Sequence, residues 1–538
     1  MKYFKTKKYS NIINVILILL ITAIVYTPLK NAFFQQDRWL VMGKILTLGK
    51  GYVFVDFPGT FRALLGEGRF LARVVTYLLM SNPFNFLPSS IYSISIHSIN
   101  SLLVYVLLNR LTDNRKISLF SALFFALSGV AFSAVIWLAA SVVTLTSTMF
   151  ILFSLIFYFE YIKIGKNKNL LISFVLLFLS LQFKEIGIFL FLLYPIGLII
   201  FGKLRIKGLL KKYWLLVISL SLVVVSRLWN FAKHTGPVAL YLTGSNENYL
   251  STLFVRLLYY PFVSLSQTLV PAQYLIPLSR RLTDIFFPSY EGVNYLVMAE
   301  TTVLDMVSTL LSFFVLIIIF LVYRKVKTNT KKELLFFLTF TFLSFIPYII
   351  VKKSFSYLDS RFYYLGVLGM SSILSTVLKF FKLHKNMIIY SLAFFLIVPH
   401  ALIVRGELNK IVQVSKERKN IIVSFENIIK NQKNKNKVVF YLDGDTDYYL
   451  PGHKVPFQGG IGYIFMVLSS NYLEIQENLF VDEYLFEIGS QGYKNEYGYF
   501  SDIGMLNEHI RKGNFKTSDI VFLKYFGGEQ KLLDETTK

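Results

Sequence analysis

Long apolar runs recur from the start of this chain to about residue 405, and they limit its possible folds more than any other feature. A helix needs about 20 consecutive apolar residues to cross the hydrocarbon core of a bilayer. Only 16% of the 538 residues are charged, against about 25% in a typical soluble domain. The sequence therefore predicts an all-α polytopic membrane protein surrounded by membrane lipids. The expected spans are 11–30, 88–109, 117–138, 141–162, 169–183, 187–202, 213–230, 302–323, 333–351, 362–380 and 387–405.

Basic residues between the runs predict how the chain is oriented. Lysines crowd the N-terminus, and the segments "GKLRIKGLLKK" (202–212), "YRKVKTNTKKE" (323–333) and "KFFKLHK" (379–385) are strongly basic. Cytoplasmic loops carry such an excess of lysine and arginine. An apolar stretch at 249–270 contains Arg256 and Pro261 and either spans or lies at the interface; only the interfacial arrangement keeps all of these segments inside. We therefore expect a multi-pass cell-membrane protein with a cytoplasmic N-terminus. The net charge of +25 lies largely in these loops, so no nucleic-acid partner is expected.

The predicted orientation also divides the chain into domains. Residues 1–405 form the membrane domain, with outer loops at 31–87, where interfacial helices are expected, and at 231–301. Residues 406–430 are expected to form a linker helix, and 431–538 a small extracytoplasmic α/β domain. In this last part "NKNKVVFYLDGDTDYYL" is typical of a strand ending in an Asp/Gly turn, and "PFQGGIGYIFMVLSSNYL" of a glycine loop before a helix.

Charged residues gather at the predicted outer helix ends. Charge at membrane depth is costly, so charged side chains there suggest a functional site. A phosphate-bearing lipid headgroup lies at that depth, and arginine and lysine hold phosphate well. A single carboxylate nearby suits a general base. The alternatives are solvated loop residues, local ion pairs and interface anchors. His97 is expected to be a buried helix contact that positions its neighbours. The charged candidates are Asp37, Glu67, Arg69, Lys184, Glu185, Arg227, Asp359 and Arg361.

Metal and thiol chemistry have little support in the sequence. The six histidines form no H-x-x-x-H pair, and the chain has no cysteine. We therefore expect no metal site and no cofactor; a divalent metal is possible chemically but unsupported.

The order of several motifs resembles the GT-C superfamily of integral membrane glycosyltransferases. The likeness is to the branch of protein O-mannosyltransferases and lipid A aminoarabinose transferases, which is glycosyltransferase family 39-like. It rests on Asp37 after the first span, "GEGRFLARVVTYLL", the long segment 97–155 with its Trp-containing turn, "FKEIGIFLFLLYP" and "DSRFYYLGVLG". It covers residues 10–405. Many members carry two adjacent acids where this chain has Gln36 and Asp37.

The resemblance implies an inverting transfer of a sugar from a polyprenyl-phosphate donor to a glycan, lipid or protein acceptor on the outer face. By carry-over, Asp37 is the general base, and Arg69, Lys184 and Arg361 hold the donor phosphate. Glu185, with Glu67, Arg227, Asp359 and His97, would position these groups. Two alternatives stay open: a lipid-linked glycan polymerase or ligase, and a non-enzymatic transporter of lipid-linked glycans.

Overall fold

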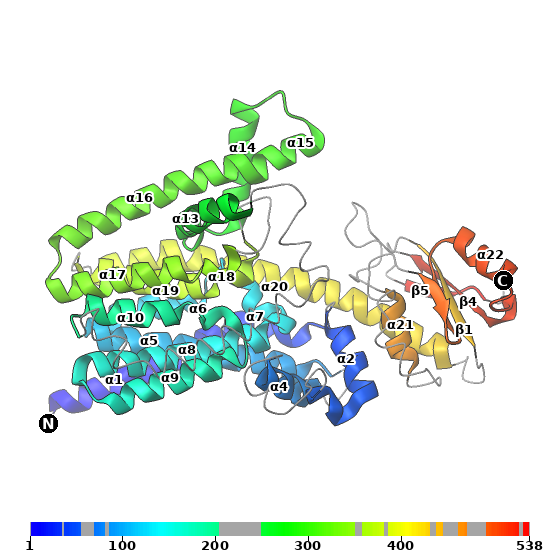
Figure 1. Cartoon of the computed structure of the whole chain (residues 1–538), viewed down its shortest axis with the longest axis horizontal. Helices are drawn as coiled ribbons and strands as arrows, with labels where there is room; N and C mark the ends of the chain where they lie inside the picture. The colour runs from blue at the N-terminus through cyan, green and yellow to red at the C-terminus, as the bar shows by residue number, and fades with distance from the viewer. Residues whose placement is uncertain are drawn as a thin grey trace. The chain divides into compact units, whose positions relative to one another are not determined.

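The computed structural model divides into two compact units, which we describe separately. The first contains Met1–Thr27, Asp56–Ala72 and Tyr92–Gly406, and the second contains Pro28–Val55, Arg73–Ile91 and Glu407–Lys538. Figure 1 shows the chain with its elements labelled. The structure describes residues 2–34, 37–54, 69–80, 85–203, 249–349, 358–380, 386–430, 437–444, 461–470, 491–526 and 531–536.

Apolar helices dominate the described residues, as the sequence predicts. Within those residues, six helices are long and apolar enough to cross a membrane. The chain is therefore a helical membrane protein, although this number is below the expected eleven. Three shorter apolar helices cover Phe70–Met80, Asn167–Leu181 and Glu185–Ile200. The six long ones are Asn11–Asn31, Leu87–Thr112, Leu138–Ile164, Gly292–Lys325, Thr328–Ile349 and Ser360–Phe380.

The expected span 117–138 is not one continuous helix, because the chain breaks there into two short helices, α6 (Arg115–Ala126) and α7 (Ser133–Ile136). Twelve residues of α6 cover only about 18 Å, too little for a bilayer core. The break occurs around Gly129, whose N–H donates to Nδ1 of His400 at 2.9 Å. A side chain at Gly129 would meet Ile403, so the backbone approaches α20 (Asn386–Lys430) closely there. The expected run 213–230 lies outside the described residues.

The remaining helices follow in chain order. The N-terminal ones are α1 (Lys2–Tyr26), η1 (Thr27–Asn31), α2 (Asp37–Leu48), η2 (Gly49–Val53), α4 (Phe70–Met80), α5 (Leu87–Thr112), α8 (Leu138–Ile164), α9 (Asn167–Leu181), η3 (Glu185–Gly187) and α10 (Leu190–Ile200). After them come α13 (Tyr249–Gln267), α14 (Ala272–Phe286), α15 (Gly292–Val297), the π-helical η4 (Met298–Val303), α16 (Leu304–Lys325), α17 (Thr328–Leu343), α18 (Ile346–Ile349), η5 (Ser360–Tyr363), α19 (Tyr364–Phe380) and α20 (Asn386–Lys430).

The first unit is built around α8, which packs along α9, as Figure 1 shows. Its buried Tyr158 stacks on Tyr194 of α10 with ring centroids 4.3 Å apart. Phe336 of α17 also stacks on the Tyr158 ring. A Cβ at Gly197 would lie 2.5 Å from the Tyr158 hydroxyl, so only glycine allows α10 to approach so closely. The left-handed Gly165, at φ +80°, ends α8.

The second unit contains a five-stranded sheet in the order β2-β3-β1-β4-β5. The central β1 is parallel to β3 and β4, and the two edge strands are antiparallel to their neighbours. The sheet and its helices confirm the α/β character expected near the C-terminus. The elements are β1 (Val438–Asp443), α21 (Ile461–Ser469), β2 (Gly492–Lys494), β3 (Tyr497–Phe500), α22 (Ile503–Arg511), η8 (Thr517–Asp519), β4 (Ile520–Phe526) and β5 (Lys531–Asp534).

Helices cover both faces of this sheet. Successive strand residues point to opposite sides, so each face offers apolar side chains for a helix to pack on. On one face Val439 packs with Leu506 of α22. On the other, Phe440 meets Phe465 of α21, which stacks on Phe425 of α20 with centroids 4.3 Å apart. The order of layers is therefore helix, sheet, helix.

Candidate functional site

Five of the charged residues chosen from the sequence come together in the first unit. Arg69 precedes α4, Lys184 and Glu185 form the turn between α9 and α10, and Asp359 and Arg361 begin η5. The four others all act electrostatically on the Lys184 ammonium. We call this set the Lys184 cluster: Arg69, Lys184, Glu185, Asp359 and Arg361.

Arg69 and Glu185 form the most directional contact of the cluster. Nη2 of Arg69 lies 2.9 Å from Oε2 of Glu185, and Nε donates to Oε1 at 3.2 Å. A bidentate pair of this kind fixes the guanidinium plane as well as its charge. Arg69 also has a left-handed backbone, with φ +57°. Such a conformation is costly for a residue with a Cβ, and residues of this kind gather at functional sites.

Lys184 is held by the wall of α8. Its ammonium donates to Oγ1 of Thr144 at 2.9 Å and lies 5.6 Å from the centroid of Phe362. Its own carbonyl accepts a hydrogen bond from Ser147. Burial lowers the pKa of the Lys184 ammonium to about 7; the positive charges of Arg69 and Arg361 lower it as well, while the two carboxylates act in the opposite direction. The group therefore changes charge near neutral pH.

Arg361 stacks on an aromatic wall. Its guanidinium carbon lies 4.0 Å from the centroid of Trp137, the residue that caps the start of α8, and 4.9 Å from that of Phe362. The Asp359 carboxylate is 3.5 Å from Nε of Arg361. Asp359 is itself fixed, because it accepts from the Ser133 hydroxyl and from the backbone N–H of Arg361.

Two buried donors lack a hydrogen-bond acceptor among the described residues: Nε of Arg361, within the cluster, and Nε1 of Trp137, on which Arg361 stacks. The Asp359 contact to Nε is an ion pair without hydrogen-bond geometry. Buried donors are nearly always satisfied, and an exception in a native protein commonly indicates a ligand or water. Together with the Lys184 ammonium, these donors suit an oxyanion such as a phosphate oxygen.

The other predicted site residues are placed differently. Asp37 is the first residue of α2 in the second unit, and its side chain lies outside the described part. Glu67 and Arg227 also lie outside the described residues. His97 is a buried helix contact: Nε2 donates to the carbonyl of Ala126 at 2.8 Å, and Nδ1 accepts from the Tyr364 hydroxyl at 2.7 Å.

Sequence reasoning missed two residues that hold the cluster, Trp137 and Thr144. They are seven residues apart on or next to α8, two helical turns, so they lie on the same face. That spacing was visible in the sequence. What each side chain meets was not, because the partners Arg361 and Lys184 are distant in the chain. The sequence also does not show which group Asp359 positions; in the structure its carboxylate lies beside Arg361.

No family model matches this chain, and no curated protein matches it.

Proposed function

We propose that the chain is a membrane glycosyltransferase that moves a sugar from a polyprenyl-phosphate donor to an acceptor at the extracytoplasmic face. The Lys184 cluster carries this proposal. Three cations from separate segments, two of them fixed by a carboxylate and one by Thr144, meet where buried donors still need an acceptor. A phosphodiester at a membrane surface supplies such an acceptor.

The reaction follows from the residues in these roles. The acceptor hydroxyl attacks the anomeric carbon of the donor sugar while the bond from that carbon to the phosphate oxygen breaks. Asp37 accepts the hydroxyl proton as general base, and the configuration inverts. Polyprenyl phosphate leaves with one more negative charge. Arg69, Lys184 and Arg361 stabilise that charge, because preorganised cations act most strongly where charge develops.

The first test measures release of polyprenyl phosphate by the purified full chain in nanodiscs. A panel of polyprenyl-phosphate sugars is supplied with an envelope extract as acceptor source. The variant Asp37→Asn is compared with Asp284→Asn, which changes an exposed acid of α14. We expect Asp37→Asn to lower turnover by about 10²–10⁴-fold, the usual contribution of a general base, with donor binding retained. Asp284→Asn should be unaffected.

The same assay separates the alternatives. Equal turnover in wild type and Asp37→Asn would remove Asp37 from the chemistry. Donor binding and transfer across the bilayer without any release of polyprenyl phosphate would replace the enzyme by a transporter. Repeated addition of one glycan unit to a lipid-linked product would identify a polymerase or ligase, which shares the donor type.

A further inference from the structure

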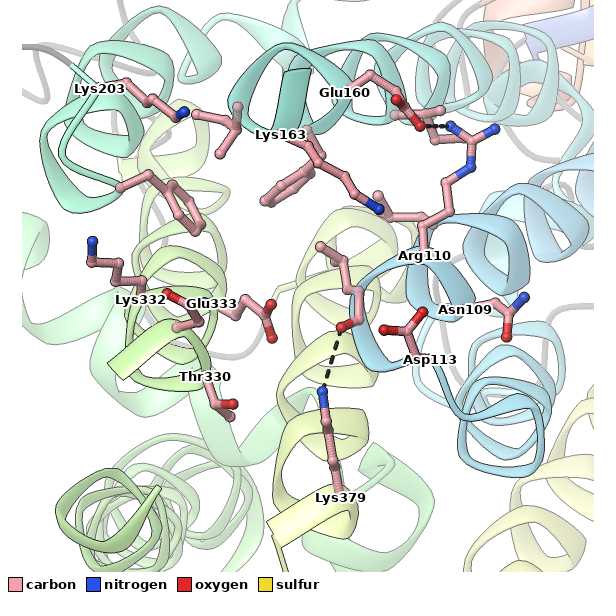
Figure 2. A pocket seen from close by; sticks show the side chains of 17 residues that line it. Asn109, Arg110, Asp113, Glu160, Lys163, Lys203, Thr330, Lys332, Glu333 and Lys379 are labelled. Carbon is pink, nitrogen blue, oxygen red and sulfur yellow. Dashed lines mark hydrogen bonds and ion pairs between the residues drawn. The ribbon is translucent and has the colours of Figure 1, made fainter. Parts of the chain in front are cut away.

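A charged cavity lies at the other end of α8, about 40 Å of helix away from Trp137. Its volume is about 740 Å³, within the 300–1,000 Å³ typical of small-molecule sites. The ends of α5, α8 and α10 and the starting turns of α17 line it, together with the last turn of α19 (Figure 2). It belongs wholly to the first unit and has no residue in common with the Lys184 cluster.

The charges of this cavity are only partly compensated. Arg110 pairs with Glu160 at 2.5 Å, and the Lys379 ammonium donates to the carbonyl of Leu111. Of the remaining acids, Asp113 and Glu333, the Glu333 carboxylate is acted on electrostatically by both Asp113 and Lys379. Among the described residues, three ammonium groups of the lining have no carboxylate within salt-bridge distance: Lys163, Lys203 and Lys332.

Apolar side chains form the rest of the wall. Leu107, Ile156 and Phe159 line the cavity and are buried; they lie about one turn inside the charged residues of α5 and α8. A site for a small soluble anion needs no such wall. An apolar wall below a basic rim suits an amphiphile with a charged head.

We propose that this cavity binds the phosphate-bearing headgroup of an anionic membrane lipid. Lys163, Lys203 and Lys332 contact the phosphate, and the apolar wall contacts the glycerol and first acyl carbons. Basic pockets between membrane helices bind anionic headgroups on the cytoplasmic side, where the leaflet is negatively charged. The segments that close the cavity are those that the positive-inside rule assigns to the cytoplasm. The proposal does not depend on the glycosyltransferase activity.

Native mass spectrometry tests the lipid-binding proposal. The full chain in detergent is titrated with increasing concentrations of phosphatidylglycerol or of phosphatidylcholine, and bound lipid is measured. The double variant Lys163→Gln/Lys332→Gln is compared with Lys166→Gln/Lys168→Gln. The control removes the same charge from two exposed lysines next to the cavity that do not line it. We expect phosphatidylglycerol to bind in preference to phosphatidylcholine, and the first variant to weaken that binding by at least about tenfold. The control should match wild type.

The phosphate group that the cavity binds could come from a lipid headgroup or from free phosphate. Competition by inorganic phosphate, added at the same concentration as the lipid, distinguishes these two sources. Displacement of phosphatidylglycerol by it would identify a soluble phosphate ligand and overturn the lipid assignment. Equal binding of phosphatidylcholine, or an equal loss in both double variants, would overturn it too. If the first variant does not fold, Lys203→Gln alone replaces it, with a weakening of about threefold expected; unchanged binding there would contradict the proposal.

Discussion

The two ends of α8 carry charge in opposite ways. At the Trp137 end, a few basic groups are each held by a specific neighbour: Arg69 by Glu185, Lys184 by Thr144, Arg361 by Trp137. At the Lys163 end, lysines surround an open cavity and several have no acidic partner among the described residues. Fixed charges suit a reaction, because they need no reorganisation as charge develops. Loosely held charges suit recognition of a headgroup. On our two proposals, the position of a cation along a membrane helix, and not the number of cations, decides its role.

Among changes that test this contrast between the two ends of α8, the largest effect is expected from removing the stacked guanidinium. Arg361→Gln should lower turnover by about 10²–10³-fold, the cost of losing one preorganised donor at a leaving phosphate. The matched change is Arg110→Gln, at the end of α5. It breaks the exposed ion pair with Glu160 near the Lys163 end of α8, which is worth only about 0–1 kcal/mol, so turnover should change little. Single-turnover release of polyprenyl phosphate measures both. Equal losses in the two variants would erase the contrast between the ends.

A smaller effect is expected from pH, because the pKa of Lys184 is lowered to about 7 by burial and by its arginine neighbours. The ammonium form, which holds the phosphodiester, dominates below that pH and is lost above it. Donor affinity should therefore fall by about tenfold from pH 6.5 to 8.5, the strength of one charge-assisted hydrogen bond. Titration of donor binding to the nanodisc protein measures this.

The matched variant is Lys184→Arg, which stays charged over the whole range. Its donor affinity should be nearly independent of pH. A fall of the same size in this variant would assign the titration to another group.

The smallest effect concerns the aromatic surface below Arg361. Trp137→Leu removes a cation–π contact worth about 0.5–2 kcal/mol and should weaken donor binding by about three- to tenfold. Trp137→Phe keeps a ring face and should lose less. Equal losses in the two variants would show that the indole N–H, which both remove, and not the attraction of the ring for the guanidinium, matters. Equilibrium donor binding distinguishes them.

Much of the membrane architecture follows from the sequence, because apolar length and helical rise alone predict a span. That reasoning predicts one continuous helix at 117–138, where no residue is charged, but the chain breaks at Gly129, whose N–H donates to His400. The site shows the same limit. Lys184, Glu185, Asp359 and Arg361 stand out as charges at predicted helix ends. The sequence does not show which of these charges form ion pairs. Glu185 could pair with the adjacent Lys184 or with the distant Arg69, and the structure shows the pair with Arg69.

The left-handed backbone of Arg69 has a consequence for how this chain can change over generations. At φ +57° a glycine would relax the backbone and help the protein fold. That same exchange would remove the guanidinium that Glu185 holds. Mutational drift toward greater stability and retention of the site therefore oppose one another at this position. At position 69 the backbone angle therefore favours glycine, while the ion pair with Glu185 requires arginine.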